Sequence, residues 1–163
     1  MSKTTFAYPA DAPVITMTRT FDAPRELVWR VITEPEHVVR WFGPTRHTNH
    51  VRHMAVRPGG TWRFETELQG GGVVVFTGEY REVVAPERLV QTFGVEGMFD
   101  GRVAVETATL EDLGGQTRYA VLSRFESLAD RDGMVASGME SGATESMDSI
   151  AAILDELQAA AVA

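Results

Sequence analysis

The stretch SGMESGATESMDSIAAILDEL, residues 137–157, decides the fold class of this chain. Apolar residues recur in it at steps of three and four, which is the spacing of one face of an α-helix: Met139, Ala143, Met147, Ile150, Leu154 and Leu157. Ser137 and Glu140 fit a capping box, so we expect the helix to begin there. A helix of about twenty residues spans about 30 Å. Its single apolar face must pack against another layer of structure.

The sequence before this helix predicts that the other layer is an antiparallel sheet. Residues 14–21 alternate as a first strand, and Pro24 and Pro35 then mark the starts of two short helices. From residue 50 to about residue 126, short alternating segments are separated by turns rich in glycine and proline. The order predicts an α+β, helix-grip fold. We expect a curved antiparallel sheet of about seven strands around the long C-terminal helix, with two short helices after the first strand.

Composition limits the class of protein. A chain of 163 residues predicts one domain, at residues 13–160, after a flexible N-terminal tail at residues 1–12. The absence of cysteine excludes disulfides and fits a reducing cytoplasm, where we expect the protein to reside. The net charge of −8 argues against nucleic acid as the main partner. No apolar run reaches the roughly twenty residues that a membrane span needs.

Ordered motifs make the chain resemble a known family. They are Phe21–Trp29, Trp41-Phe42-Gly43-Pro44, Arg57–Arg63, Gly78-Glu79-Tyr80 with Pro86–Val90, Gly114–Arg118, and Gly138–Gly142. Together they resemble the START-like, or SRPBCC, superfamily. Within the superfamily, they are most similar to the branch of the activator of heat-shock protein 90 ATPase (Aha1-type) C-terminal domain. The resemblance is strong for the fold and weak for the function, because one fold hosts many functions.

The chain departs from this family's usual pattern at a few places. Ala55-Val56 stands where the family often has an acidic residue, and Ala143 stands where it often has tryptophan. Ser123 aligns where it often has histidine. The smaller residues would either enlarge an internal cavity or be compensated by repacking.

The fold that the resemblance implies leaves room for an apolar pocket between the sheet and the long helix. We expect the pocket to be lined by Trp41, Phe42, Phe64, Phe76, Tyr80, Gln91, Phe93, Tyr119, Phe125, Met139, Met147 and Ile150. Trp41 and Phe42, with Met98 and Phe99, are expected at the rim. Aromatic and methionine residues at these spacings would equally fill a solid core, so both interpretations stay open.

The orientation of two polar residues depends on strand parity. Counting back from Leu110 on the inner face places Glu106 inside, whereas Val103 and Val105 favour the opposite parity and place it in water. An inward carboxylate is costly unless it is paired or functional, so Glu106 is the one candidate catalytic residue. Gln91 lies between Leu89 and Phe93, either facing a ligand or bonding to a neighbouring strand.

Metal and cofactor chemistry have little support in the sequence. His47, His50 and His53 are spaced by three, and neither a strand nor a helix brings the three side chains together. No metalloprotease, nucleophile-elbow, phosphate-loop or dinucleotide motif occurs. We therefore expect no metal site and no cofactor.

These observations leave three classes of function. The first is a START-like protein that binds a hydrophobic small molecule in the cavity. The second is an enzyme similar to the polyketide aromatase/cyclases of the superfamily, with Glu106 and Tyr80 or Tyr119 as acid and base. The third is a module that contacts a chaperone, which the family name suggests. The third is weaker, because the Aha1-type activators carry a separate N-terminal domain that this sequence lacks. The chain is expected to be a monomer or a homodimer.

Overall fold

The structure, a computed structural model, describes residues 2–162, so Met1 of the expected tail lies outside the described residues. The first half contains β1 (Thr5–Ala7), β2 (Val14–Phe21), α1 (Arg25–Thr33), α2 (Pro35–Trp41), β3 (Thr48–Met54), β4 (Thr61–Glu67) and β5 (Val73–Val84). The second half contains β6 (Arg88–Val95), the 3₁₀ turn η1 (Phe99–Gly101), β7 (Ala104–Asp112), β8 (Thr117–Arg124), α3 (Leu128–Ala136) and α4 (Met139–Val162).

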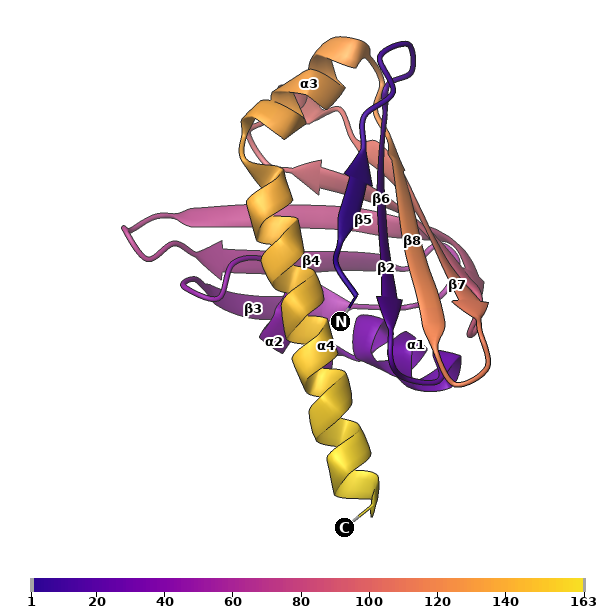
Figure 1. The fold of residues 1–163 in the computed structure, drawn as a ribbon. Coiled ribbons are helices and arrows are strands. Elements are labelled where there is room, and N and C mark those ends of the chain that lie inside the picture. The colour runs from indigo at the N-terminus through magenta and orange to yellow at the C-terminus, as the bar shows by residue number, and fades with distance from the viewer. Residues whose placement is uncertain (1, 163) are drawn as a thin grey trace.

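The strands of residues 2–162 form one antiparallel sheet in the order β1-β2-β8-β7-β6-β5-β4-β3. Strands β3 to β8 follow one another as a meander, and β2 then pairs with β8. The sheet curves around α4, with α1 and α2 at one end and α3 at the other (Figure 1). This arrangement confirms the predicted α+β, helix-grip fold.

The concave face of the sheet is apolar because its strands alternate. In β4 the side chains of Trp62 and Phe64 are buried, whereas Arg63 points to the opposite face and pairs with Glu65. Trp62 also packs closely on β5. A β-carbon added to Gly78 would lie 2.4 Å from the Trp62 indole nitrogen, so this position of the sheet requires a glycine.

Helix α4 lies across the concave face and buries a single apolar face, as its periodicity predicts. Its buried side chains include Met147, Ile150, Ile153 and Leu154. At residues 151–157 this face meets Val28 and Val31 of α1 in the same core, which closes that end of the fold. Among residues 2–162, no helix is long and apolar enough to cross a bilayer.

The predicted capping box at the start of α4 is wrong. Ser137 closes the preceding helix α3 instead, and its hydroxyl donates a hydrogen bond of 2.6 Å to the Met134 carbonyl. Gly138 then adopts a positive φ of 84°, which breaks the chain between the two helices. The Glu140 carboxylate accepts a hydrogen bond from Tyr8 rather than capping the helix.

The tail expected at residues 1–12 is also partly wrong. Residues Thr5–Ala7 form β1, which pairs with Thr16–Thr18 of β2 and brings the number of strands to eight. Arg131 of α3 stabilises the following turn, because its guanidinium donates hydrogen bonds to the carbonyls of Pro9, Ala12 and Val14. The sequence patterns did not predict helix α3. Its N-cap is Ser127, whose hydroxyl accepts a hydrogen bond from the Asp130 backbone N–H.

Candidate functional site

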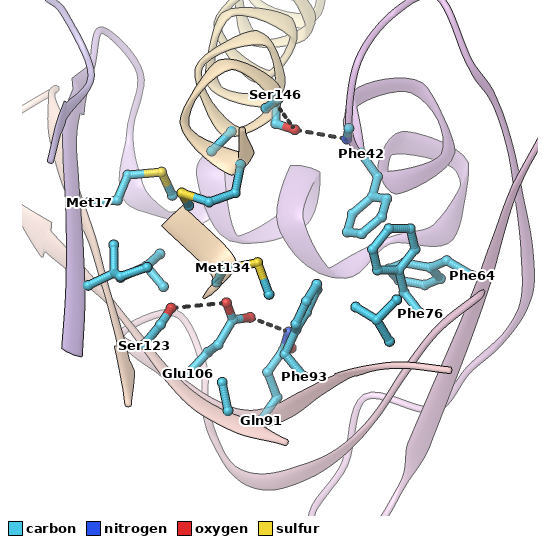
Figure 2. A pocket seen from close by; sticks show the side chains of 18 of the residues that line it. Met17, Phe42, Phe64, Phe76, Gln91, Phe93, Glu106, Ser123, Met134 and Ser146 are labelled. Carbon is cyan, nitrogen blue, oxygen red and sulfur yellow. Dashed lines mark hydrogen bonds between the residues drawn. The ribbon is translucent and has the colours of Figure 1, made fainter. Parts of the chain in front are cut away.

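A cavity of about 540 Å³ lies between the concave face of the sheet and α4. Strands β2 and β4 to β8 form its floor, the segment Trp41–Arg46 forms one side, and α3 and the first half of α4 form the roof. The lining is mostly apolar, with a few polar side chains directed inward (Figure 2). This is the usual composition of a small-molecule site.

One side of the cavity is an aromatic wall made of Phe42, Phe64, Phe76 and Phe93 (Figure 2). The Phe42 ring lies 5.0 Å, centre to centre, from both Phe64 and Phe76, in edge-to-face contacts. Phe76 and Phe93 lie 5.6 Å apart. Aromatic pairs with this geometry stabilise one another beyond the area that they bury, so the wall is a preformed surface.

Three hydrogen bonds fix the segment that carries Phe42. The Trp41 indole donates a hydrogen bond of 2.8 Å to the Val31 carbonyl, which ties α2 to α1. The Gly43 N–H donates a bond of the same length to the Ser146 hydroxyl on α4. The Asn49 side-chain amide donates to the Phe42 carbonyl. Phe42 is therefore positioned by α1, α4 and β3 together.

Glu106 on β7 extends from the sheet into the cavity (Figure 2). Its two carboxylate oxygens accept one hydrogen bond each. Gln91 Nε2 donates to Oε1 at 3.3 Å, and Ser123 Oγ donates to Oε2 at 3.1 Å. The donors lie on β6 and β8, the strands on either side of β7, directly opposite Glu106 in both registers. The sheet therefore holds the carboxyl group in one orientation.

The surroundings of Glu106 act on its pKa in opposite directions. Burial raises the pKa of Glu106, because an apolar cavity disfavours the charged form, while the bonds from Ser123 and Gln91 lower it; the net effect is upward. Burial, with a smaller contribution from the Glu106 charge, also raises the pKa of Tyr119. The site thus contains a carboxyl group that can exchange a proton nearer to neutral pH than usual.

The sequence matches the model of one known protein family over most of its length. The sequence model of the family described as activator of Hsp90 ATPase homolog 1-like protein matches residues 22–155. The chain belongs to this family. The match confirms the resemblance that the motifs suggested, and it covers all of the cavity lining except Ile15 and Met17 of β2.

Solved structures of similar fold come from several bacteria. A protein from Arthrobacter aurescens is 25% identical with a TM-score of 0.86, over 93% of this chain and 91% of that one. A protein from Mycobacterium smegmatis is 22% identical with a TM-score of 0.84, over 93% and 96%. DynU16, described as a putative protein in the dynemicin biosynthetic locus, is 19% identical with a TM-score of 0.64, over 88% and 47%. No curated protein matches the sequence.

The structure places most of the residues expected at the pocket on the cavity surface. These are Trp41, Phe42, Phe64, Phe76, Tyr80, Gln91, Phe93, Tyr119, Phe125, Met139 and Met147, with Glu106 among them. Met98 also contacts the cavity, whereas Phe99 borders a separate small hollow beside Arg102. Ile150 was expected at the cavity and does not line it. It is fully buried in the core, because the sheet and α1 close against α4 at that level.

Glu106 of β7 faces inward, as counting back from Leu110 predicted. Ala104, Glu106 and Ala108 all line the cavity, and Leu110 is buried beyond it. Val105 lies on the opposite face, and Val103 precedes the strand, so neither determines the direction of Glu106. The two alanines leave open space on either side of the carboxyl group.

Sequence reasoning missed Ser123 as a partner of Glu106. The signal was present, because the hairpin at Leu113-Gly114-Gly115 pairs Asp112 with Thr117, and counting six residues outward from this pair reaches Glu106 and Ser123. It also missed Met17, Met134 and Ser146 of the lining. Met134 had no comparable signal, because α3 was not foreseen.

Two of the places where the chain departs from the family pattern border the cavity. Ser123 and Ala143 both line it, whereas Val56 packs against the core and does not reach the cavity. Smaller residues at positions 123 and 143 therefore leave space that a histidine and a tryptophan would occupy.

The three histidines on and beside β3 have separate partners. His47 accepts a hydrogen bond from the Gln69 N–H, His50 pairs with Glu67, and His53 contacts the Thr61 hydroxyl at 3.0 Å. Three possible metal ligands, Glu34, Glu36 and His37, come together at the start of α2. That cluster lies at the α1–α2 junction and is not part of the cavity lining.

Proposed function

We propose that this protein binds a hydrophobic small molecule in the cavity between the sheet and α4. The observation that carries the proposal is the cavity of about 540 Å³, with its aromatic wall and its methionine-rich roof. A solid core would leave no such space in a protein interior, where side chains normally pack without voids larger than a water molecule.

The driving force would be removal of apolar ligand surface from water. A ligand that buries about 200 Å² of apolar surface gains roughly 5 kcal/mol, before the cost of its lost freedom, at about 25 cal/mol per Å². The hydrogen bonds made by Trp41, Gly43 and Asn49 position Phe42 before a ligand enters. A preformed wall lowers the ordering cost of binding. Met17, Met134 and Met147 provide adaptable surface on the other side.

Native mass spectrometry of the protein purified from its own host tests this proposal. We expect a bound apolar compound, which is released on denaturation and can then be identified. The matched control is Ala143→Trp, which places an indole in the cavity without removing any hydrogen bond made by a side chain. The variant should melt within a few degrees of the wild type and carry no compound. An empty wild-type protein that also fails to bind added apolar compounds contradicts the proposal.

The position of Glu106 favours a second candidate function, an enzyme that moves protons on the bound molecule. A carboxyl group with a raised pKa in an apolar cavity can act as a general acid or base. Tyr119, on the same face of β8 as Ser123, would be the second group. If the protein converts its ligand, Glu106→Gln should lower kcat by about a hundredfold or more. Unchanged turnover in that variant would remove Glu106 from the mechanism.

A further inference from the structure

We propose that the ligand of this cavity carries a protonated amine, which pairs with Glu106 while its apolar part lies along the aromatic wall. The inference rests on the proposed function, namely that the cavity binds a hydrophobic small molecule. It adds the chemical class of the polar group on that molecule.

The charges on the cavity surface point to a cation. Among the described residues that line the cavity, two carry a formal charge, Glu106 and Arg46. Arg46 lies in the loop after α2, is more than half exposed, and has Glu145 of α4 as a partner at 3.7 Å. Glu106 receives hydrogen bonds from the neutral side chains of Gln91 and Ser123, and within residues 2–162 no basic side chain forms an ion pair with it. A half-buried carboxylate in an apolar cavity is costly without a counter-ion, and a cationic ligand would remove that cost.

The geometry of the carboxyl group suits an ammonium ion. Gln91 and Ser123 donate from the two flanking strands, one to each oxygen, and so orient the group toward the open cavity (Figure 2). Each oxygen retains an acceptor position for a further donor. Donors on both oxygens stabilise the ionised form, which is the form that pairs with a cation.

The groups around Glu106 add no competing charge. From β8 it faces the tyrosine Tyr119, whose raised pKa keeps it neutral. From α3 and α4 the cavity receives the methionines Met134 and Met147, which are uncharged. Phe93 lies beside Gln91 (Figure 2), and the negative face of an aromatic ring attracts an organic cation. A ligand with an apolar body and an ammonium group would therefore satisfy both parts of the surface.

A ligand with a neutral acceptor, such as a ketone, is the alternative that must be separated. It would need Glu106 protonated, so that the carboxyl group donates a hydrogen bond. The two alternatives respond to pH in opposite directions. Affinity for an amine falls as the pH is lowered through the pKa of Glu106, because the carboxylate is lost. Affinity for a ketone rises over the same range.

Calorimetric titration of the full chain with two probes of similar shape tests the inference. The probes are 2-naphthylmethylamine, which is protonated at neutral pH, and 2-acetylnaphthalene, which is a ketone. We expect the wild type to bind the amine about tenfold or more tightly than the ketone, as for a hydrogen bond to a charged group. Glu106→Gln should lose this preference. Glu79→Gln removes a carboxylate from the exposed outer face of β5 and should bind like the wild type.

Each outcome of this experiment decides between the proposals. If the wild type binds both probes equally, or if Glu106→Gln keeps its preference for the amine, the inference is overturned while cavity binding stands. If neither probe binds the wild type, both proposals fail. The pH dependence of the wild-type affinity needs no variant. Weaker amine binding toward acid pH supports the inference, and an unchanged or stronger affinity overturns it.

Discussion

Ser123 lies directly opposite Glu106 on the β7–β8 hairpin, and its hydroxyl donates a hydrogen bond of 3.1 Å to the Glu106 carboxylate. The family pattern often has a histidine at this position. The serine of this chain is smaller, so it leaves the carboxyl group of Glu106 facing open space. The Ser123–Glu106 pair therefore influences both the pKa of Glu106 and the size of the cavity.

Ser123→Ala removes a donor that holds the Glu106 pKa down, so we expect the pKa of Glu106 to rise further. The measurement is an NMR titration of the Glu106 side-chain carboxyl carbon. Ser123→Thr keeps a hydroxyl at the same position and serves as the control, with a pKa close to that of the wild type. A pKa that stays the same or falls in Ser123→Ala would contradict the role of this bond.

Glu106→Gln should stabilise the ligand-free protein at neutral pH. The folded-state pKa of Glu106 is raised, so its contribution to stability is fully present below the unfolded pKa and is lost as the pH rises through the folded pKa. The neutral amide avoids this loss and can still bond to Gln91 and Ser123.

Thermal unfolding of Glu106→Gln and the wild type across pH measures the effect. We expect the melting temperature of the variant to be higher by roughly 2–4 °C at neutral pH, as for a gain of about 1 kcal/mol in a chain of this size. The difference should vanish at acid pH, where both side chains are neutral. A variant that is less stable than the wild type at neutral pH would show that the Glu106 carboxylate makes a stabilising contact besides those with Gln91 and Ser123.

Ser146→Ala should loosen the aromatic wall, because the Ser146 hydroxyl holds the residue next to Phe42. It leaves the Gly43 N–H without its bond of 2.8 Å, and Phe42 is the residue that precedes Gly43 in the chain. Loss of the partner of this partly buried donor should cost about 1 kcal/mol, which urea unfolding would detect.

Ser149→Ala, three residues further along α4, is the matched control for Ser146→Ala. Alanine favours a helix slightly over serine, so this variant should be as stable as the wild type or slightly more stable. If the two variants have equal stability, the Gly43–Ser146 bond does not hold the loop. If Ser146→Ala binds apolar probes as tightly as the wild type, the aromatic wall does not depend on this hydrogen bond.

Arg102→Lys should loosen α3. The Arg102 guanidinium makes two bonds of 2.7 Å to the buried Asp130 carboxylate at the start of α3, and lysine cannot reproduce both. We expect amide exchange in residues 128–136 to accelerate by about three- to tenfold. Arg88→Lys, at an exposed pair with Glu82, is the control and should leave α3 unchanged.

The effect of Arg102→Lys should depend on pH with a defined sign. Arg102 lowers the pKa of Asp130, so the pair contributes stability above the unfolded pKa of Asp130 and loses it as the pH falls through the folded pKa. Exchange in the wild type and the variant should therefore converge at acid pH. A difference that persists there would assign the effect to packing rather than to the ion pair.

Local patterns in the sequence were sufficient to predict most of the fold. The alternation around Trp62 and Phe64 and the helical spacing from Met139 to Leu157 each report a residue's immediate environment, which follows from the period of a strand or a helix. The β7–β8 hairpin was likewise visible in its glycine turn. For this reason the helix-grip fold could be predicted from the sequence. The expectation of a cavity came from the family resemblance, and most of the residues named for it line the cavity, although they are a minority of its lining.

The tertiary structure alone decided the remaining features. The apolar face of α4 has the same spacing along its length, so it could not show that Met147 borders a cavity while Ile150 lies in a closed core. That difference depends on where the sheet and α1 meet the helix. The strand β1 is too short to carry a signal and forms because β2 offers an edge. The sequence by itself placed Glu106 among the candidates, and only the pairing of β6, β7 and β8 decided that it faces the cavity, because strand parity depends on neighbouring strands.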